Sequence, residues 1–147
     1  MSVVSAPEGS TQLWAASATS PPAGAQRTYY EKVFVVNNNT ATTLTAAQIE
    51  VASETPGMPA GALLDLALTT ALNDAGMVAN RQTAPSSGVG AFVTQPAFAV
   101  VSSPGNLPSG TAPNAAGAQG LWLRLTLPAG AAAYKGSADL RTQGMTT

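Results

Sequence analysis

The sequence predicts an all-β protein: an antiparallel β-sandwich, immunoglobulin-like or jelly-roll-like, with an extended N-terminal arm and long loops. Three observations predict it. Short apolar clusters recur along the chain, and several alternate between apolar and polar residues, as half-buried strands do. The clusters are separated by turn-forming residues, including 14 glycines and 11 prolines. The length of 147 residues suits a single domain, which we divide into an arm, 1–28, and a sandwich domain, 29–147.

The arm is mostly small and polar, and Leu13 and Trp14 form its large apolar pair. Prolines and a glycine near its end interrupt regular structure. We therefore expect an arm that carries a short strand around 11–16. The first eleven residues lack the basic region and the long apolar run of a signal peptide. No segment approaches the roughly 18 apolar residues needed to span a bilayer.

The first strong strand is predicted at 29–36 (YYEKVFVV), which is rich in aromatic and β-branched residues. Three asparagines follow it and favour a turn. Residues 40–51 are a weaker candidate that could hold a bend between two short strands. Residues 53–61 are predicted to form a loop with two prolines and two glycines. Residues 62–72 suit a helix by their alanine and leucine content, but we favour a strand because their leucines alternate with Asp65.

Residues 91–101 are predicted to form one or two strands, and Pro96 within them indicates a sheet edge or a bulge. Residues 102–120 form a long loop, which in a compact domain is typical of a functional segment or of one ordered by a partner. The clearest strand is 121–127 (LWLRLTL), whose leucines face one way and whose other residues face the opposite way. Residues 136–143 alternate again and are expected to form the closing strand.

The composition excludes several kinds of chemistry. The chain has no Cys and no His, which excludes disulfides, thiol nucleophiles, imidazole bases and zinc sites of the Cys or His type. Charged residues make up only 9% of the chain and the net charge is −1, which argues against nucleic-acid binding. We expect no enzymatic activity, no cofactor, no metal site and no membrane partner. So few charges also favour a protein that works inside an assembly.

The acidic residues are scattered along the chain. A hydrolase that acts through carboxylates needs two acids facing each other across a cleft. No spacing predicts such a pair, although Glu50, Asp65 and Asp74 remain candidates for one formed by folding. Arg124 and Arg141 are expected on solvent faces or paired with acids of neighbouring strands.

Aromatic residues are the candidates for contact with a partner, since tryptophan and tyrosine often anchor interfaces. Trp14 lies in the arm, where a solvated indole would waste apolar area. Trp122 alternates onto the face opposite the leucines, so it either covers a second face of the core or contacts a neighbour. Tyr29 and Tyr30 are adjacent, so they point to opposite sheet faces and only one can join the main core. The candidate interface residues are therefore Trp14, Tyr29 and Trp122.

Three blocks of the sequence resemble segments of small virion proteins of tailed bacteriophages. They are 120–130 (GLWLRLTLPAG) with the AAAY that follows, 30–38 (YEKVFVVNN) and 79–85 (ANRQTAP). The first block is similar to a strand and turn that precede a final strand in those proteins. Together the blocks touch residues 29–144, and residues 1–28 have no counterpart.

The resemblance implies a β-sandwich domain of a phage particle, located in the virion after assembly in the host cytoplasm, with no catalytic residues. Its expected role is to decorate or cement the capsid shell. The implied partners are the major capsid protein and copies of the chain itself, in a symmetric homo-oligomeric assembly. A tail, baseplate or neck component, including a receptor- or glycan-binding module, is the alternative. The arm and the loop at 102–120 suit a cement protein, because many symmetric copies strengthen binding by extended segments.

Overall fold

The structure is a computed structural model, and it describes residues 2–5, 24–55, 58–72, 82–95, 101–102, 106–110, 117–131 and 137–147. All the regular elements in these ranges are strands, so the prediction of an all-β fold is confirmed. The strands are β1 (Ser2–Ser5), β2 (Arg27–Asn37), β3 (Leu44–Thr55), β4 (Leu63–Leu68), β5 (Val93–Gln95), β6 (Val101–Ser102), β7 (Gln119–Leu127) and β8 (Ser137–Thr146).

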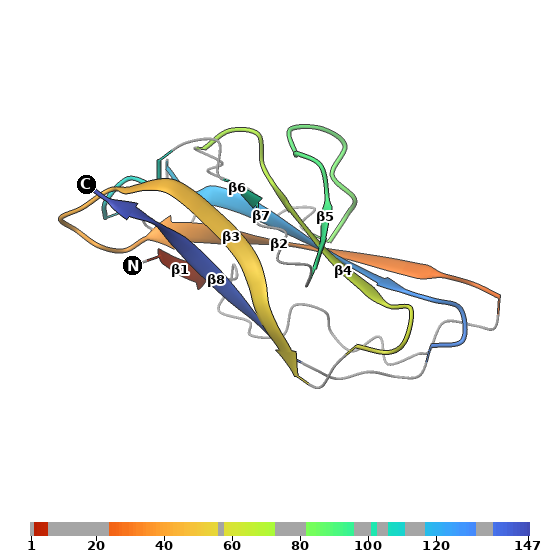
Figure 1. Cartoon of the computed structure of the whole chain (residues 1–147). Helices are drawn as coiled ribbons and strands as arrows, with labels where there is room; N and C mark the ends of the chain where they lie inside the picture. Colours follow the sequence, from red (N-terminus) through yellow and green to blue (C-terminus); the bar gives the residue numbers. More distant parts are fainter. Residues whose placement is uncertain are drawn as a thin grey trace.

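The strands form two antiparallel sheets (Figure 1). The larger sheet has the order β1-β2-β7-β4-β5, and the smaller one has the order β6-β3-β8. In Figure 1, β3 and β8 pass in front of β2 and β7 and cross them at an angle. Of the strands described, only β1 with β2 and β4 with β5 are both consecutive in the chain and paired. The architecture therefore rests mainly on contacts between distant segments.

The main core lies between the two sheets and takes buried side chains from both. The five-stranded sheet supplies Val33, Val35, Leu64, Leu66, Leu68, Leu121 and Leu123, and the three-stranded sheet supplies Leu44, Ala47, Ile49 and Val51. The predicted alternation of β7 is confirmed. Leu121 and Leu123 enter this core, and Leu125 and Leu127 enter a smaller cluster with Ala131. Each buried Leu or Val contributes roughly 1.5–3 kcal/mol through removal of apolar surface from water. The predicted antiparallel sandwich is thereby confirmed.

The stretch 62–72 contains the strand β4, as favoured over a helix, although β4 ends at Leu68. Leu64, Leu66 and Leu68 face the core, and Leu63 and Asp65 face the other way. Leu66 lies opposite Leu123 of β7. In the described part of 91–101 lie β5 and the start of β6, which belong to different sheets and lie at the edge of each. The edge position predicted from Pro96 is confirmed for both strands, although Pro96 itself lies outside the described residues.

Residues 40–51, the weaker strand candidate of the sequence, lie largely in one long strand, β3. A β-bulge in β3 takes the place of the expected bend. The pairing of β3 with β8 shifts register between Thr45 and Gln48, and Ala46 in this interval has a φ of 50°. An extra residue on one strand bends it without ending it. β3 also extends into the segment 53–61 that was expected to be a loop, because pairing with β8 continues as far as Thr55 opposite Ser137.

The long connection between β6 and β7 is fixed to the core at Leu107. This side chain is fully buried, and its backbone exchanges two hydrogen bonds with Leu44, at 2.8 and 3.0 Å. The asparagine turn after β2 holds the same segment. The Asn37 side-chain amide donates to the backbone carbonyls of Thr42 at 2.8 Å and of Leu107 at 3.2 Å. The turn predicted from the three asparagines is confirmed, and it also anchors part of the loop predicted at 102–120.

The N-terminal arm contributes an edge strand to the larger sheet. β1 pairs antiparallel with the end of β2, with Ser5 opposite Phe34. β2 begins at Arg27, slightly earlier than the sequence suggested. The short strand expected at 11–16, together with Trp14, lies outside the described residues.

Candidate functional site

The outer face of the five-stranded sheet, turned away from β3 and β8, carries a row of polar and aromatic residues. Alternation places the core leucines on the inner face and the residues between them on the outer face. The register then aligns one side chain from each of four strands. Tyr30 of β2 lies opposite Arg124 of β7. Arg124 lies opposite Asp65 of β4, and Asp65 lies opposite Thr94 of β5. Four separate segments of the chain therefore build one site.

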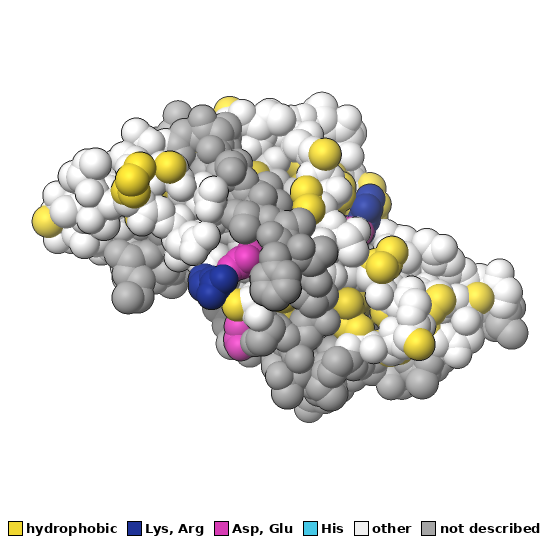
Figure 2. All heavy atoms as spheres, in the orientation of Figure 1, with side chains coloured by type: hydrophobic (Ala, Val, Ile, Leu, Met, Phe, Trp, Pro, Cys, Tyr) yellow, Lys and Arg dark blue, Asp and Glu magenta, His cyan; other side chains and the backbone are white. Residues whose placement is uncertain are grey.

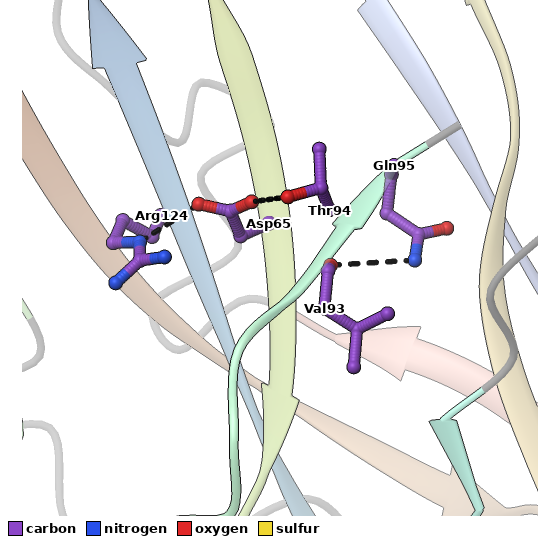
Figure 3. A network of polar contacts seen from close by, with 5 residues as sticks. All are labelled: Asp65, Val93, Thr94, Gln95 and Arg124. Atoms are coloured by element: carbon purple, nitrogen blue, oxygen red, sulfur yellow. Dashed lines mark hydrogen bonds and ion pairs between the residues drawn. The ribbon is translucent and has the colours of Figure 1, made fainter. Parts of the chain in front are cut away.

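Asp65 is the polar centre of this row (Figure 3). Its Oδ2 accepts a hydrogen bond from Arg124 Nε at 2.8 Å, and its Oδ1 accepts one from the Thr94 hydroxyl at 2.7 Å. The Asp65 side chain is 2% exposed, whereas that of Arg124 is 33% exposed. A buried carboxylate is tolerated when its lone pairs are used in this way. The carboxylate therefore holds the arginine at a fixed place on the sheet.

Two aromatic rings complete the row. The guanidinium carbon of Arg124 lies 4.2 Å from the centre of the Phe92 ring, a cation–π contact. The Phe92 ring packs edge-on against Tyr30, with centroids 6.2 Å apart and an interplanar angle of 67°. Arg124 is thus supported on one edge by a carboxylate and on one face by a ring.

The outer face has an exposed end and a buried end. We call the exposed end the Tyr30–Arg124 patch. It consists of Thr28, Tyr30, Leu63, Phe92, Thr94 and Arg124, all of them exposed or half-buried. Leu63 is 45% exposed, which is unusual for a leucine in this sandwich. The buried end includes Phe34, Trp122 and Lys32, whose ammonium lies 5.4 Å from the Phe34 ring centre and 5.5 Å from that of Trp122.

The structure does not bring the sequence-based interface candidates together. Trp122 is almost fully buried at the covered end of the outer face. Tyr29 is half-buried against Leu125 and Leu127 on the inner side, so it occupies the opposite face of the same sheet. Trp14 lies outside the described residues. Of the tyrosine pair, Tyr30 is the one that shares a face with Trp122 and belongs to the exposed patch.

The acids considered for catalysis lie in different sheets. Asp65 pairs with Arg124 across β4 and β7, and Glu50 pairs with Arg141 across β3 and β8. In each pair the two residues are directly opposite in register. The expectation that both arginines pair with acids of neighbouring strands is confirmed. Asp74 lies outside the described residues.

Charge is sparse on the face drawn in Figure 2, where the few basic side chains lie beside acidic ones. Within the described part of the chain, no three Asp, Glu, His or Cys residues gather as a metal site would require. No helix there is long and apolar enough to cross a membrane. What these residues do offer is a fixed arginine beside aromatic and apolar groups, an arrangement suited to non-covalent recognition.

The fold and this site define an antiparallel β-sandwich with a rigid, partly exposed aromatic and arginine face. No protein-family model, curated protein or solved structure matches the chain.

Proposed function

We propose that the chain is a structural protein of a tailed-bacteriophage particle that decorates or cements the capsid shell. It would bind between subunits of the major capsid protein, in many symmetric copies within the virion. The proposal starts from the resemblance of three sequence blocks to small virion proteins of these phages.

The observation that carries the proposal is that these three blocks meet in space. The block at 30–38 lies in and just after β2, and the block at 120–130 covers most of β7; the two strands pair, with Val33 opposite Leu121. Of the block at 79–85 the structure describes residues 82–85, and these reach the same sheet, because Gln82 Nε2 donates to Glu31 Oε2 at 2.9 Å. The described parts of the segments that resemble the phage proteins therefore lie together in this chain.

The Tyr30–Arg124 patch supports a binding role. Tyrosine and arginine are enriched among the residues that dominate binding energy at interfaces. Apart from Phe92, the patch lies on paired strands, so its backbone loses little freedom when a partner docks. A shell-binding protein gains from such rigidity, because each of its many copies must fit the same lattice.

A tail, baseplate or neck component is the second candidate, and one feature favours a glycan-binding form of it. Tyr30 and Phe92 are partly exposed beside the polar groups of Arg124 and Thr94. Aromatic faces next to a few fixed polar groups are common in small-ligand sites. In this form the same patch would bind a sugar instead of a capsid subunit.

A particle experiment separates the two. Phage particles produced with and without this chain would be compared for the temperature at which they release their genome, and the bound chain would be located by electron microscopy. The proposal expects density repeated over the head and a lower release temperature without the chain. Density confined to the tail, or intact particles that lack the chain and release at the same temperature, would overturn it.

A further inference from the structure

We infer that Arg124 is a preformed receptor for a carboxylate side chain of the protein partner; this rests on the proposed function. The guanidinium has three parts that can contact other groups: its Nε edge, its two flat faces and its terminal edge. Asp65 occupies the Nε edge at 2.8 Å, and Phe92 covers one face at 4.2 Å. The second face and the terminal edge remain, and of these only the terminal edge, with the N–H groups of Nη1 and Nη2, can donate hydrogen bonds.

The terminal edge has no acceptor among the residues that the structure describes. The hydrogen bond of Arg124 to Asp65 that Figure 3 draws uses Nε, and no described residue accepts a hydrogen bond from Nη1 or Nη2. Arg141 provides a contrast. It binds its buried acid, Glu50, through the terminal nitrogen Nη2. Arg124 thus keeps for a partner the edge that Arg141 uses within its own sheet.

The chemistry of this edge selects a planar oxyanion. Two parallel N–H groups match the two oxygens of a carboxylate and bind it in bidentate fashion. The side chain is already ordered by Asp65 and Phe92, so docking does not have to freeze it. Because Asp65 offsets the charge of Arg124, the patch is not a strong positive surface of the kind that binds a phosphate backbone.

The surroundings favour a protein as the source of the carboxylate. The same patch presents Tyr30 and the exposed Leu63, which suit an apolar contact around a central charged pair. We therefore assign the occupant as an Asp or Glu side chain on the capsid protein, enclosed by apolar contacts from Tyr30 and Leu63.

The test uses Arg124→Lys, which keeps a positive charge beside Asp65 but removes the forked terminal edge. Binding of the fluorescently labelled full chain to particles prepared without it would be titrated. Arg124→Lys should weaken binding about 10-fold or more, the usual range for a central charged contact. Arg141→Lys is the matched control, since that arginine also pairs with a buried acid but in the other sheet; it should bind like wild type.

Folding and partner identity are checked in parallel. Thermal unfolding must show that both lysine variants are folded at the titration temperature, and Leu63→Ser, at an exposed position, provides a second patch variant that should also bind more weakly. Equal binding of wild type and Arg124→Lys overturns the inference while leaving the capsid role intact. Wild type that does not bind particles overturns the proposed function and the assigned partner with it. If Arg124→Lys instead dissociates an oligomer of the free chain, the occupant is a second copy and the assignment is wrong.

Discussion

The side chain of Gln95 joins the two sheets: its Oε1 accepts a hydrogen bond from the backbone N–H of Val51 at 3.1 Å. Gln95 lies on β5, at the edge of the five-stranded sheet, and Val51 lies on β3, in the other sheet. The register of β3 with β8 shifts directly after Val51. Both residues are buried, so this hydrogen bond satisfies a backbone group beside an irregularity in the pairing.

Replacement of Gln95 by leucine should lower the free energy of unfolding by about 1–3 kcal/mol, because it leaves the buried Val51 N–H without its acceptor. Urea unfolding of both proteins measures the change. Gln143→Leu is the control, since its amide hydrogen-bonds Gln48 at 3.1 Å in an exposed position; its effect should stay within about 0.5 kcal/mol. If both variants lose the same free energy of unfolding, the hydrogen bond between the sheets contributes no more to stability than the exposed one.

Leu107→Ala should destabilise the fold by about 2–5 kcal/mol, the usual result of truncating a fully buried leucine. Leu107 lies in the connection between β6 and β7, where a leucine would ordinarily be exposed. A large loss of stability would therefore show that this connection is part of the core. Thermal or chemical denaturation gives the value. Leu63→Ala, at an exposed leucine, is the comparison and should cost less than about 1 kcal/mol. A small loss at Leu107 would mean that this loop does not contribute to the core.

Gly144→Ala should destabilise the pairing of β3 with β8 by about 1–3 kcal/mol. A Cβ at this position would lie 2.7 Å from the Thr45 carbonyl oxygen and 2.9 Å from Leu44 Cγ, closer than van der Waals contact allows. Gly90→Ala is the matched variant, because its Cβ would meet the Leu68 carbonyl oxygen at an ordinary 3.4 Å. Equilibrium unfolding should separate them clearly. An unaffected Gly144→Ala variant would contradict the close approach at the bulge.

Asp65→Ala should lower stability by about 2 kcal/mol, because Arg124 and Thr94 both lose their acceptor. The partial exposure of Arg124 keeps the loss below that expected when a fully buried charge is left alone. A double-mutant cycle with Thr94→Ala measures the coupling, which should be about 1 kcal/mol. Additive effects of the two replacements would show that the hydrogen bond between them is energetically neutral.

Alternation along single strands made much of this fold predictable. The leucines of β7, and Leu64, Leu66 and Leu68 of β4, face inward as their period of two requires. The edge position of β5 and β6 was predicted from the proline between them. The sequence also predicted that Arg124 and Arg141 could pair with acids of neighbouring strands. Their particular partners, Asp65 and Glu50, depend on which strands become neighbours, and no local pattern encodes that.

The candidate site was less predictable for the same reason. The row of side chains depends on the register of four strands. Its aromatic support comes from Phe92, just before β5, and the strand prediction for 91–101 did not show which residue that ring would contact. The sequence did show that Tyr29 and Tyr30 face opposite ways. It could not show that Tyr30 is the one beside the arginine, because that choice follows from the side of the sheet that β3 covers.

The strand order also bears on how the chain can fold as it is synthesised. β2 pairs residue by residue with β7 from Arg27 opposite Leu127 to Val35 opposite Gln119. During synthesis, β2 and β4 therefore leave the ribosome before β7, the strand with which both of them pair. Until Leu127 has emerged, two apolar strands have open edges of the kind that pair with other chains. We expect the productive sandwich to assemble late, in a step controlled by the arrival of β7.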